Sequence, residues 1–115
     1  MGPMADATMS ATEYALRALA QRAEVTAHNV ANANTPGFRA SRVEFESALA
    51  EALETGQTPE AVTATDAGGV PDAVGNTVDM EDEMVSMMKD NLLQSALVNA
   101  HNFKTGPLRN AITGR

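Results

Sequence analysis

The feature that most constrains the fold is the placement of glycine and proline, which leaves two long stretches of the chain free of both. Residues 12–33 contain neither and are rich in Ala, Leu, Gln, Arg and Glu, which favour helices. Residues 79–105 also contain neither, and Gly106 and Pro107 follow directly. The sequence therefore predicts two long helices, one toward each end of an all-α chain.

The first predicted helix carries a narrow apolar seam. Its members alternate spacings of three and four residues, as in a coiled coil: Leu16, Leu19, Ala23, Thr26, Val30 and Ala33. Alanine and threonine make this seam thin, so a single partner helix would stabilise it little. We expect several partners, although an ordinary amphipathic helix in a small bundle fits the same spacing.

The second predicted helix is apolar on more than one side. Asp79 is a good N-cap, and three acidic residues follow it where the helix dipole is positive. Apolar residues then recur along the helix, among them Met84, Met88, Leu92, Ala96 and Phe103. Such a broad face needs more than one packing partner. We interpret the methionines as packing residues rather than ligands.

A turn and a shorter helical pattern lie between the long helices. Thr35-Pro36-Gly37-Phe38 has Pro second and Gly third, which favours a type II turn. Residues 42–54 show apolar residues every four positions, and Gly56 is a natural stop. Residues 55–76 hold four Gly and two Pro without a sustained period, which is typical of a flexible or extended linker.

These patterns divide the chain of 115 residues into four parts. We expect a flexible N-terminus at 1–11, a helix, turn and short helix at 12–54, a linker at 55–76, and a helix with a tail at 77–115. The N-terminus lacks the basic and apolar regions of a cleavable secretory signal. No stretch approaches the roughly 20 apolar residues of a membrane span.

Charge is distributed unevenly along the chain. The net charge is -7, which argues against nonspecific nucleic-acid binding. Residues 44–90 hold twelve acidic residues against one lysine. This centre is either a solvated acidic surface, or the acidic partner of basic ends on neighbouring copies. The basic candidates for that contact are Arg17, Arg22, Arg39, Arg109 and Arg115.

The sequence offers little that could perform chemistry. His28 and His101 have no partner at metal-ligand spacing, and the chain contains no Cys. Phosphate-binding glycine motifs and the nucleophile elbow are missing. We therefore predict no catalytic residue, cofactor, metal or small-molecule substrate, and no enzyme.

One motif allows a comparison with a known family. Ala31-Asn32-Ala33-Asn34-Thr35-Pro36-Gly37-Phe38 closely resembles the signature ANxNTPG[FY] shared by bacterial flagellar rod, hook and hook-associated proteins. Within that family, residues 43–49, 75–84 and 108–112 are similar to the members that build the proximal rod. The chain is also too short for the large middle domains of the hook and distal rod proteins.

The resemblance implies an axial structural protein. Family members have terminal helices that pack as a coiled coil and line a helical tube, through which the flagellar type III apparatus exports unfolded chains. It also implies a place in the basal-body rod, export without a cleaved signal, and a role in joining the rod to the export gate and transmitting torque. The implied partners are other copies, other rod proteins, a FliE-type adaptor and the export gate.

The C-terminal tail and two other protein classes complete the expectations. Leu108, Arg109 and Ile112 follow a helix break, so they form either a separate contact with unlike partners or a frayed tail. A small type VII helical hairpin has a similar size, but its Trp-x-Gly turn is missing because the chain has no Trp. A cytoplasmic adaptor or another short rod subunit are the remaining alternatives.

Overall fold

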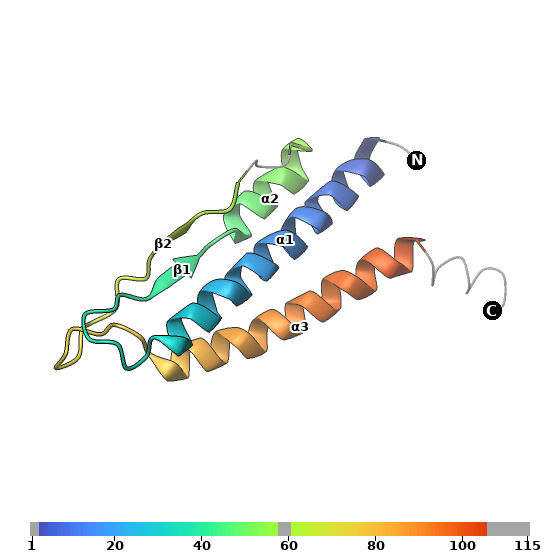
Figure 1. Ribbon diagram of the computed structural model, residues 1–115. Helices are drawn as coiled ribbons and strands as arrows, with labels where there is room; N and C mark the ends of the chain where they lie inside the picture. The colour runs from blue at the N-terminus through green and yellow to red at the C-terminus, as the bar shows by residue number, and fades with distance from the viewer. Residues whose placement is uncertain (1–2, 58–60, 106–115) are drawn as a thin grey trace.

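The described part of the chain folds into three helices and a small two-stranded sheet. The computed structural model describes residues 3–57 and 61–105, with side chains from 8 to 57 and from 61 to 100. Along the chain, Figure 1 shows α1 (Pro3–Ala31), β1 (Ser41–Val43), α2 (Glu46–Thr55), β2 (Ala64–Asp66) and α3 (Met80–Thr105). The fold is mostly helical, as predicted, but the all-α expectation missed the sheet.

The longest helix, α1, lies at the centre of the arrangement. α3 runs back along α1 in the opposite direction, while α2 and the two strands lie along another side of it (Figure 1). The core gathers where α1 meets α2 and β1, and it is built from Tyr14, Ala15, Ala18, Leu19, Val43 and Phe45. Among the α3 side chains that the structure describes, the partly buried Leu93 and Leu97 are the ones that pack against this core. Most apolar side chains of α3 are therefore left outside it.

The first helix begins earlier than predicted. It starts at Pro3 rather than Thr12, so most of the expected flexible N-terminus is helical. Proline suits the first turn of a helix because its missing N–H needs no partner there, and no glycine interrupts residues 4–11. The helix ends at Ala31, just before the predicted end at Ala33.

The middle of the chain corrects two further expectations. Residues 42 and 43 belong to a strand rather than to a helix, and β1 pairs antiparallel with β2, with Arg42 opposite Thr65. Val43 is buried at 2% exposure, and β-branched side chains favour this pleated setting. Residues 64–66, which were expected to belong to the linker, thus form a strand. The helix stop is confirmed, because Gly56 takes the left-handed conformation with φ 73°.

The start of α3 agrees with the sequence. The backbone N–H of Asp82 donates to Oδ1 of Asp79 at 3.2 Å, which confirms Asp79 as the N-cap. Glu81, Asp82 and Glu83 occupy the first turn, where the helix dipole favours negative charge.

Candidate functional site

The signature motif lies at one end of the two long helices, where the chain leaves α1 and later enters α3 (Figure 1). We call this region the junction, comprising residues 29–41 and 72–79 together with Glu83. The predicted turn is confirmed, because the N–H of Phe38 donates to the carbonyl of Thr35 at 3.2 Å and Gly37 has φ 73°. Residues 72–79 then pack against this turn.

Asn76 joins the two segments of the junction. Its buried side chain donates from Nδ2 to the carbonyls of Asn32 and Thr35, both at 2.8 Å. Its Oδ1 accepts the N–H of Val78 at 2.8 Å. One amide thus satisfies carbonyls at the end of α1 and fixes the chain that leads into α3. Sequence reasoning missed Asn76, and its only signal was its place in the segment 75–84 that resembles the family.

Asn29 joins three elements in a similar way. Its side chain is 1% exposed, and Oδ1 accepts the N–H of Ser41 at 3.0 Å. Nδ2 donates to the carbonyl of Ser41 at 2.8 Å and to Oε1 of Glu83 at 3.0 Å. Asn29 thus links α1 to the start of β1 and to α3.

Glu83 is the titratable group of this network. Burial raises the pKa of its carboxyl, and the neighbouring charges of Asp82 and Asp79 raise it further. The hydrogen bond from Asn29 acts in the other direction, because it stabilises the charged form. Burial has the larger effect, so the pKa lies above its ordinary value.

Backbone hydrogen bonds complete the junction. Gly37 donates to the carbonyl of Val74 at 2.8 Å, and Thr77 donates to that of Phe38 at 3.0 Å. The Oγ1 of Thr77 accepts the N–H of Ala40 at 2.8 Å. Within the described part of the chain, every buried side-chain nitrogen and oxygen has a partner. The junction is therefore a closed polar network with a fixed geometry.

The motif residues divide into two groups. Asn32 caps the end of α1, since its Nδ2 donates to the carbonyl of His28 at 2.8 Å. The ring of Phe38 packs edge-on against His28, with ring centroids 5.5 Å apart. Five motif residues are instead exposed: Ala31, Asn34, Thr35, Pro36 and Gly37.

Arg22 ties α1 to its surroundings. It donates from Nε to the carbonyl of Val43 at 3.1 Å, from Nη1 to Asp90 at 2.9 Å, and from Nη2 to Glu46. Its guanidinium lies over the ring of Phe45, 4.5 Å from the centroid. The side chain thus holds α2 and α3 against α1.

Arg39 is also paired within the chain. Its Nε donates to Oδ2 of Asp66 at 2.7 Å, across the small sheet. Two of the five basic residues expected to approach neighbouring copies, Arg22 and Arg39, are therefore bound to acidic residues of their own chain. Acidic groups of the centre do meet basic groups, but inside one copy.

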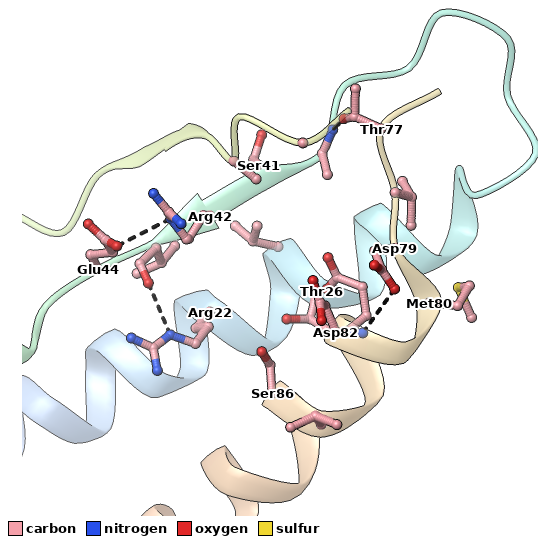
Figure 2. Close-up of a pocket in the computed structure, with 18 of the residues that line it drawn as sticks. Arg22, Thr26, Ser41, Arg42, Glu44, Thr77, Asp79, Met80, Asp82 and Ser86 are labelled. Atoms are coloured by element: carbon pink, nitrogen blue, oxygen red, sulfur yellow. Dashed lines mark hydrogen bonds and ion pairs between the residues drawn. The ribbon is translucent and has the colours of Figure 1, made fainter. Parts of the chain in front are cut away.

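An open cavity of about 890 Å³ lies beside the junction. In Figure 2, Ser41 and Thr77 lie on one side of it, and Asp82 and Ser86 from α3 lie on the other. Arg42 on its lining is paired with Glu44 at 3.3 Å. Among residues 3–57 and 61–105, no group of three or more His, Cys, Asp or Glu could hold a metal ion.

The face of α3 that points away from the core is apolar and exposed. Met84, Met88 and Leu92 are 59%, 67% and 73% exposed, and we call these three residues the outward ridge. Leu93 and Leu97, on the other side of the helix, pack against the core. The expectation that α3 is apolar on more than one side is confirmed.

The other predicted assembly residues have different settings. Leu19 belongs to the core, Leu16 and Val30 are half-buried, and Ala23 and Ala96 are exposed. Phe103 lies in α3, but its side chain is outside the described residues, as are the tail residues Leu108, Arg109 and Ile112.

A second groove runs between α1 and α3, with a volume of about 380 Å³. Its lining is Leu19, Ala23, Thr26, Ala27, Val30, Ala31, Met87, Asp90, Asn91 and Gln94. Most of the lining residues from α1 are alanine and valine, so this wall of the groove is apolar and its side chains are short. None of the helices described is long and apolar enough to cross a membrane.

Comparison with known proteins places this arrangement in a family. The family described as "Flagella basal body rod protein" matches residues 9–39, which include most of α1 and the whole turn. A flagellar basal body rod protein FlgB from Aeromonas hydrophila is 34% identical, covering 89% of each chain. FlgB of Escherichia coli is 32% identical over 77% of this chain and 80% of its own, and that of Bacillus subtilis is 29% identical over 93% and 94%.

These relatives are structural rod proteins and not enzymes, and the same holds for this chain. The type VII hairpin and the cytoplasmic adaptor are thereby set aside. The signature turn and long helices reflect a role in the basal body of the flagellum, and the chain belongs to the FlgB family of flagellar basal body rod proteins.

Proposed function

We propose that the chain is a subunit of the proximal rod, which assembles helically with other copies and other rod proteins around an axial export channel. The observation that carries this proposal is the outward ridge of α3. Met88 and Leu92 are mostly in water in the single chain. Burying such side chains stabilises a contact by about 1.5–3 kcal/mol each, so assembly is the state that covers them.

The junction, at the end where the chain leaves α1 and enters α3, supports the same proposal. A rod subunit that transmits torque must keep its two long helices at a fixed angle under load. Asn29 and Asn76 fasten α1 to α3 through buried hydrogen bonds that join distant segments. This fastening makes the signature motif a positioning device for the two assembly helices.

The proposal extends to partners unlike the subunit itself. A proximal subunit joins the rod to a FliE-type adaptor and the export gate, so it needs contacts that other rod members lack. We assign these to the tail residues Leu108, Arg109 and Ile112, which lie outside the described residues. The subunit reaches this place by type III export, without a cleaved signal peptide.

The proposal is tested in a motile strain in which this chain replaces the rod subunit it resembles. A map of the isolated basal body is expected to show the chain in successive subunits around the axial channel, at the base of the rod. Mass spectrometry of the assembled protein is expected to find its N-terminus uncleaved. A closed dimer outside the axis would contradict the proposal.

The tail is tested separately by deleting residues 107–115. The truncated chain is expected to be exported but to stop rod assembly at its first step. Export is followed by the amount of subunit outside the cytoplasm, and assembly by the basal bodies recovered. A complete rod and hook built from truncated subunits would show that the tail makes no required contact.

A further inference from the structure

The groove between α1 and α3 has a floor of small side chains. Ala23, Ala27 and Ala31 are spaced four residues apart along α1, and all three are exposed. Residues four apart lie in one row on a helix, so these alanines form a low strip beside Met87 of α3. The distance between packed helices depends on the side chains at their contact, and short ones permit close approach.

The outward ridge is complementary in shape to the row of alanines. Met84, Met88 and Leu92 are also spaced four residues apart, and their long side chains stand 59–73% exposed. A row of long side chains packs into a row of short ones when two helices meet, as in ridges-into-grooves packing. The groove and the outward ridge lie on different faces of one copy, so the outward ridge cannot be buried in the groove of its own copy.

We infer that the groove of one copy receives the outward ridge of a second copy, with the second α3 antiparallel to α1. In this arrangement Leu92, Met88 and Met84 of the second copy lie against Ala23, Ala27 and Ala31 in turn. The inference rests on the proposed function, because it names the contact by which rod subunits join.

Charge determines the direction of the second helix. Glu24 and Lys89 are exposed, and neither makes an ion pair within the described residues. Glu24 follows Ala23 by one position, and Lys89 follows Met88 by one. Because successive residues turn about 100° around a helix, an antiparallel pair places these two charges on the same side of the contact. A parallel pair would place them on opposite sides.

The arrangement has a consequence for symmetry. Within one copy α3 is antiparallel to α1 (Figure 1), so a neighbour docked by an antiparallel α3 points the same way as the first copy. Each copy then offers a groove to one neighbour and a ridge to another. Such a heterologous contact does not pair two copies as a two-fold axis does, and it generates an open helical array where the rotation between copies does not close into a ring.

The chain contains no cysteine, which permits a clean cross-linking test. Two differently tagged chains, one with Ala27→Cys and one with Met88→Cys, are produced together in cells that lack the unmodified protein. A disulfide needs Cα atoms within about 7 Å, and one cysteine per chain restricts it to contacts between copies. We expect a mixed disulfide in isolated basal bodies.

A matched control pair combines Met88→Cys with Leu53→Cys. Leu53 is 55% exposed on α2, away from the groove, so this pair is expected to give background cross-linking alone. A second pair, Ala23→Cys with Leu92→Cys, tests the same register one turn along. It also serves where a Met88→Cys chain does not assemble.

Charge exchange tests the direction of the helix. Glu24→Lys in the first chain is expected to lower the mixed disulfide by up to about five-fold, the range of an exposed ion pair. Lys89→Glu in the second chain is expected to restore it. An unchanged yield in all combinations would overturn the antiparallel arrangement.

The outcomes separate the contact from the function. Complete rods that contain Met88→Cys homodimers but no mixed disulfide would overturn the inference and leave the rod proposal standing, because the ridges would then meet each other. If the unmodified chain, produced alone, were absent from isolated basal bodies, the proposed function itself would be overturned. A mixed disulfide in both test pairs and in no control pair supports both.

Discussion

The junction and the outward ridge of α3 are opposite in character, although they belong to the same hairpin. The junction is polar and closed: Asn29 and Asn76 are almost fully buried, and their side chains are bonded to other segments. The outward ridge is apolar and open, with Leu92 73% exposed. Buried polar groups with complete partners specify one geometry, whereas an exposed apolar row needs a partner from outside. One region therefore sets the shape of the subunit, and the other sets what the subunit joins.

The largest effect is expected where the two regions differ most, at the outward ridge. Met88→Glu with Leu92→Glu places two charges on the contact face and should abolish rod assembly and swimming. Both side chains are exposed, so the free energy of unfolding of the single chain should change by less than about 0.5 kcal/mol. Leu53→Glu, an exposed apolar position on α2, is the control and should leave swimming intact. A swimming double variant would show that this face is not a contact.

Substitutions in the junction should show the reverse: they should lower the stability of the single chain rather than remove a contact between copies. Asn29→Ala removes three hydrogen bonds and leaves the N–H and carbonyl of Ser41 without that partner. We expect the free energy of unfolding to fall by about 2–4 kcal/mol, as measured by thermal or denaturant unfolding. Asn34→Ala, at an exposed motif position, should change stability by less than about 0.5 kcal/mol. Equal effects at the two positions would contradict the network.

A third prediction compares two glycines with the same backbone conformation. Gly37 and Gly68 both have φ 73°, and an added Cβ would meet open space at either position. Valine at either site should therefore destabilise the chain by about 1–3 kcal/mol through backbone strain. Only Gly37→Val distorts the turn between the assembly helices, so it should stop motility while Gly68→Val does not. Motility lost in both would indicate that stability alone is responsible.

The smallest effect concerns pH. Burial holds the pKa of Glu83 above its ordinary value of 4.5, so the folded chain keeps this proton more tightly than the unfolded chain does. The stabilisation from this group is therefore full below pH 4.5 and is lost as pH rises through the folded value. Glu83→Gln keeps an acceptor for Asn29, so it should flatten this part of the profile of stability against pH. At neutral pH it should raise the free energy of unfolding by less than about 1 kcal/mol. The exposed Glu81→Gln is the control, and an identical profile in both would exclude a role for burial.

Local signals were sufficient for the start of α3, the end of α2 and the turn, although not for the start of α1. The cap at Asp79, the stop at Gly56 and the positive φ of Gly37 each follow from a few neighbouring residues. The strand at residues 41–43 could not be predicted in this way, because β1 exists through its pairing with β2, more than twenty residues away. A helical period in residues 42–54 was outweighed there by burial of Val43.

The site was predicted less completely than the fold. The motif identified where the turn lies, but half of the network that holds it comes from residues 72–83, which the motif does not include. Asn76 has no local pattern that marks it as a cap for another segment. Conversely, the spacing of Met84, Met88 and Leu92 showed that α3 has more apolar surface than one partner covers, and their exposure agrees with it.

The span of the junction bonds determines the order in which the chain can fold. Asn76 bonds to a carbonyl 44 positions earlier, and Asn29 bonds to a carboxylate 54 positions later. Closing such loops costs entropy that is recovered only when the distant contacts form, whereas α1 needs only local bonds. The first helix can therefore appear early, but the turn that follows it becomes fixed only when residues 72–83 arrive. We therefore expect the junction to form late in folding, and a nascent chain that ends before residue 72 would hold the signature without the bonds from Asn76.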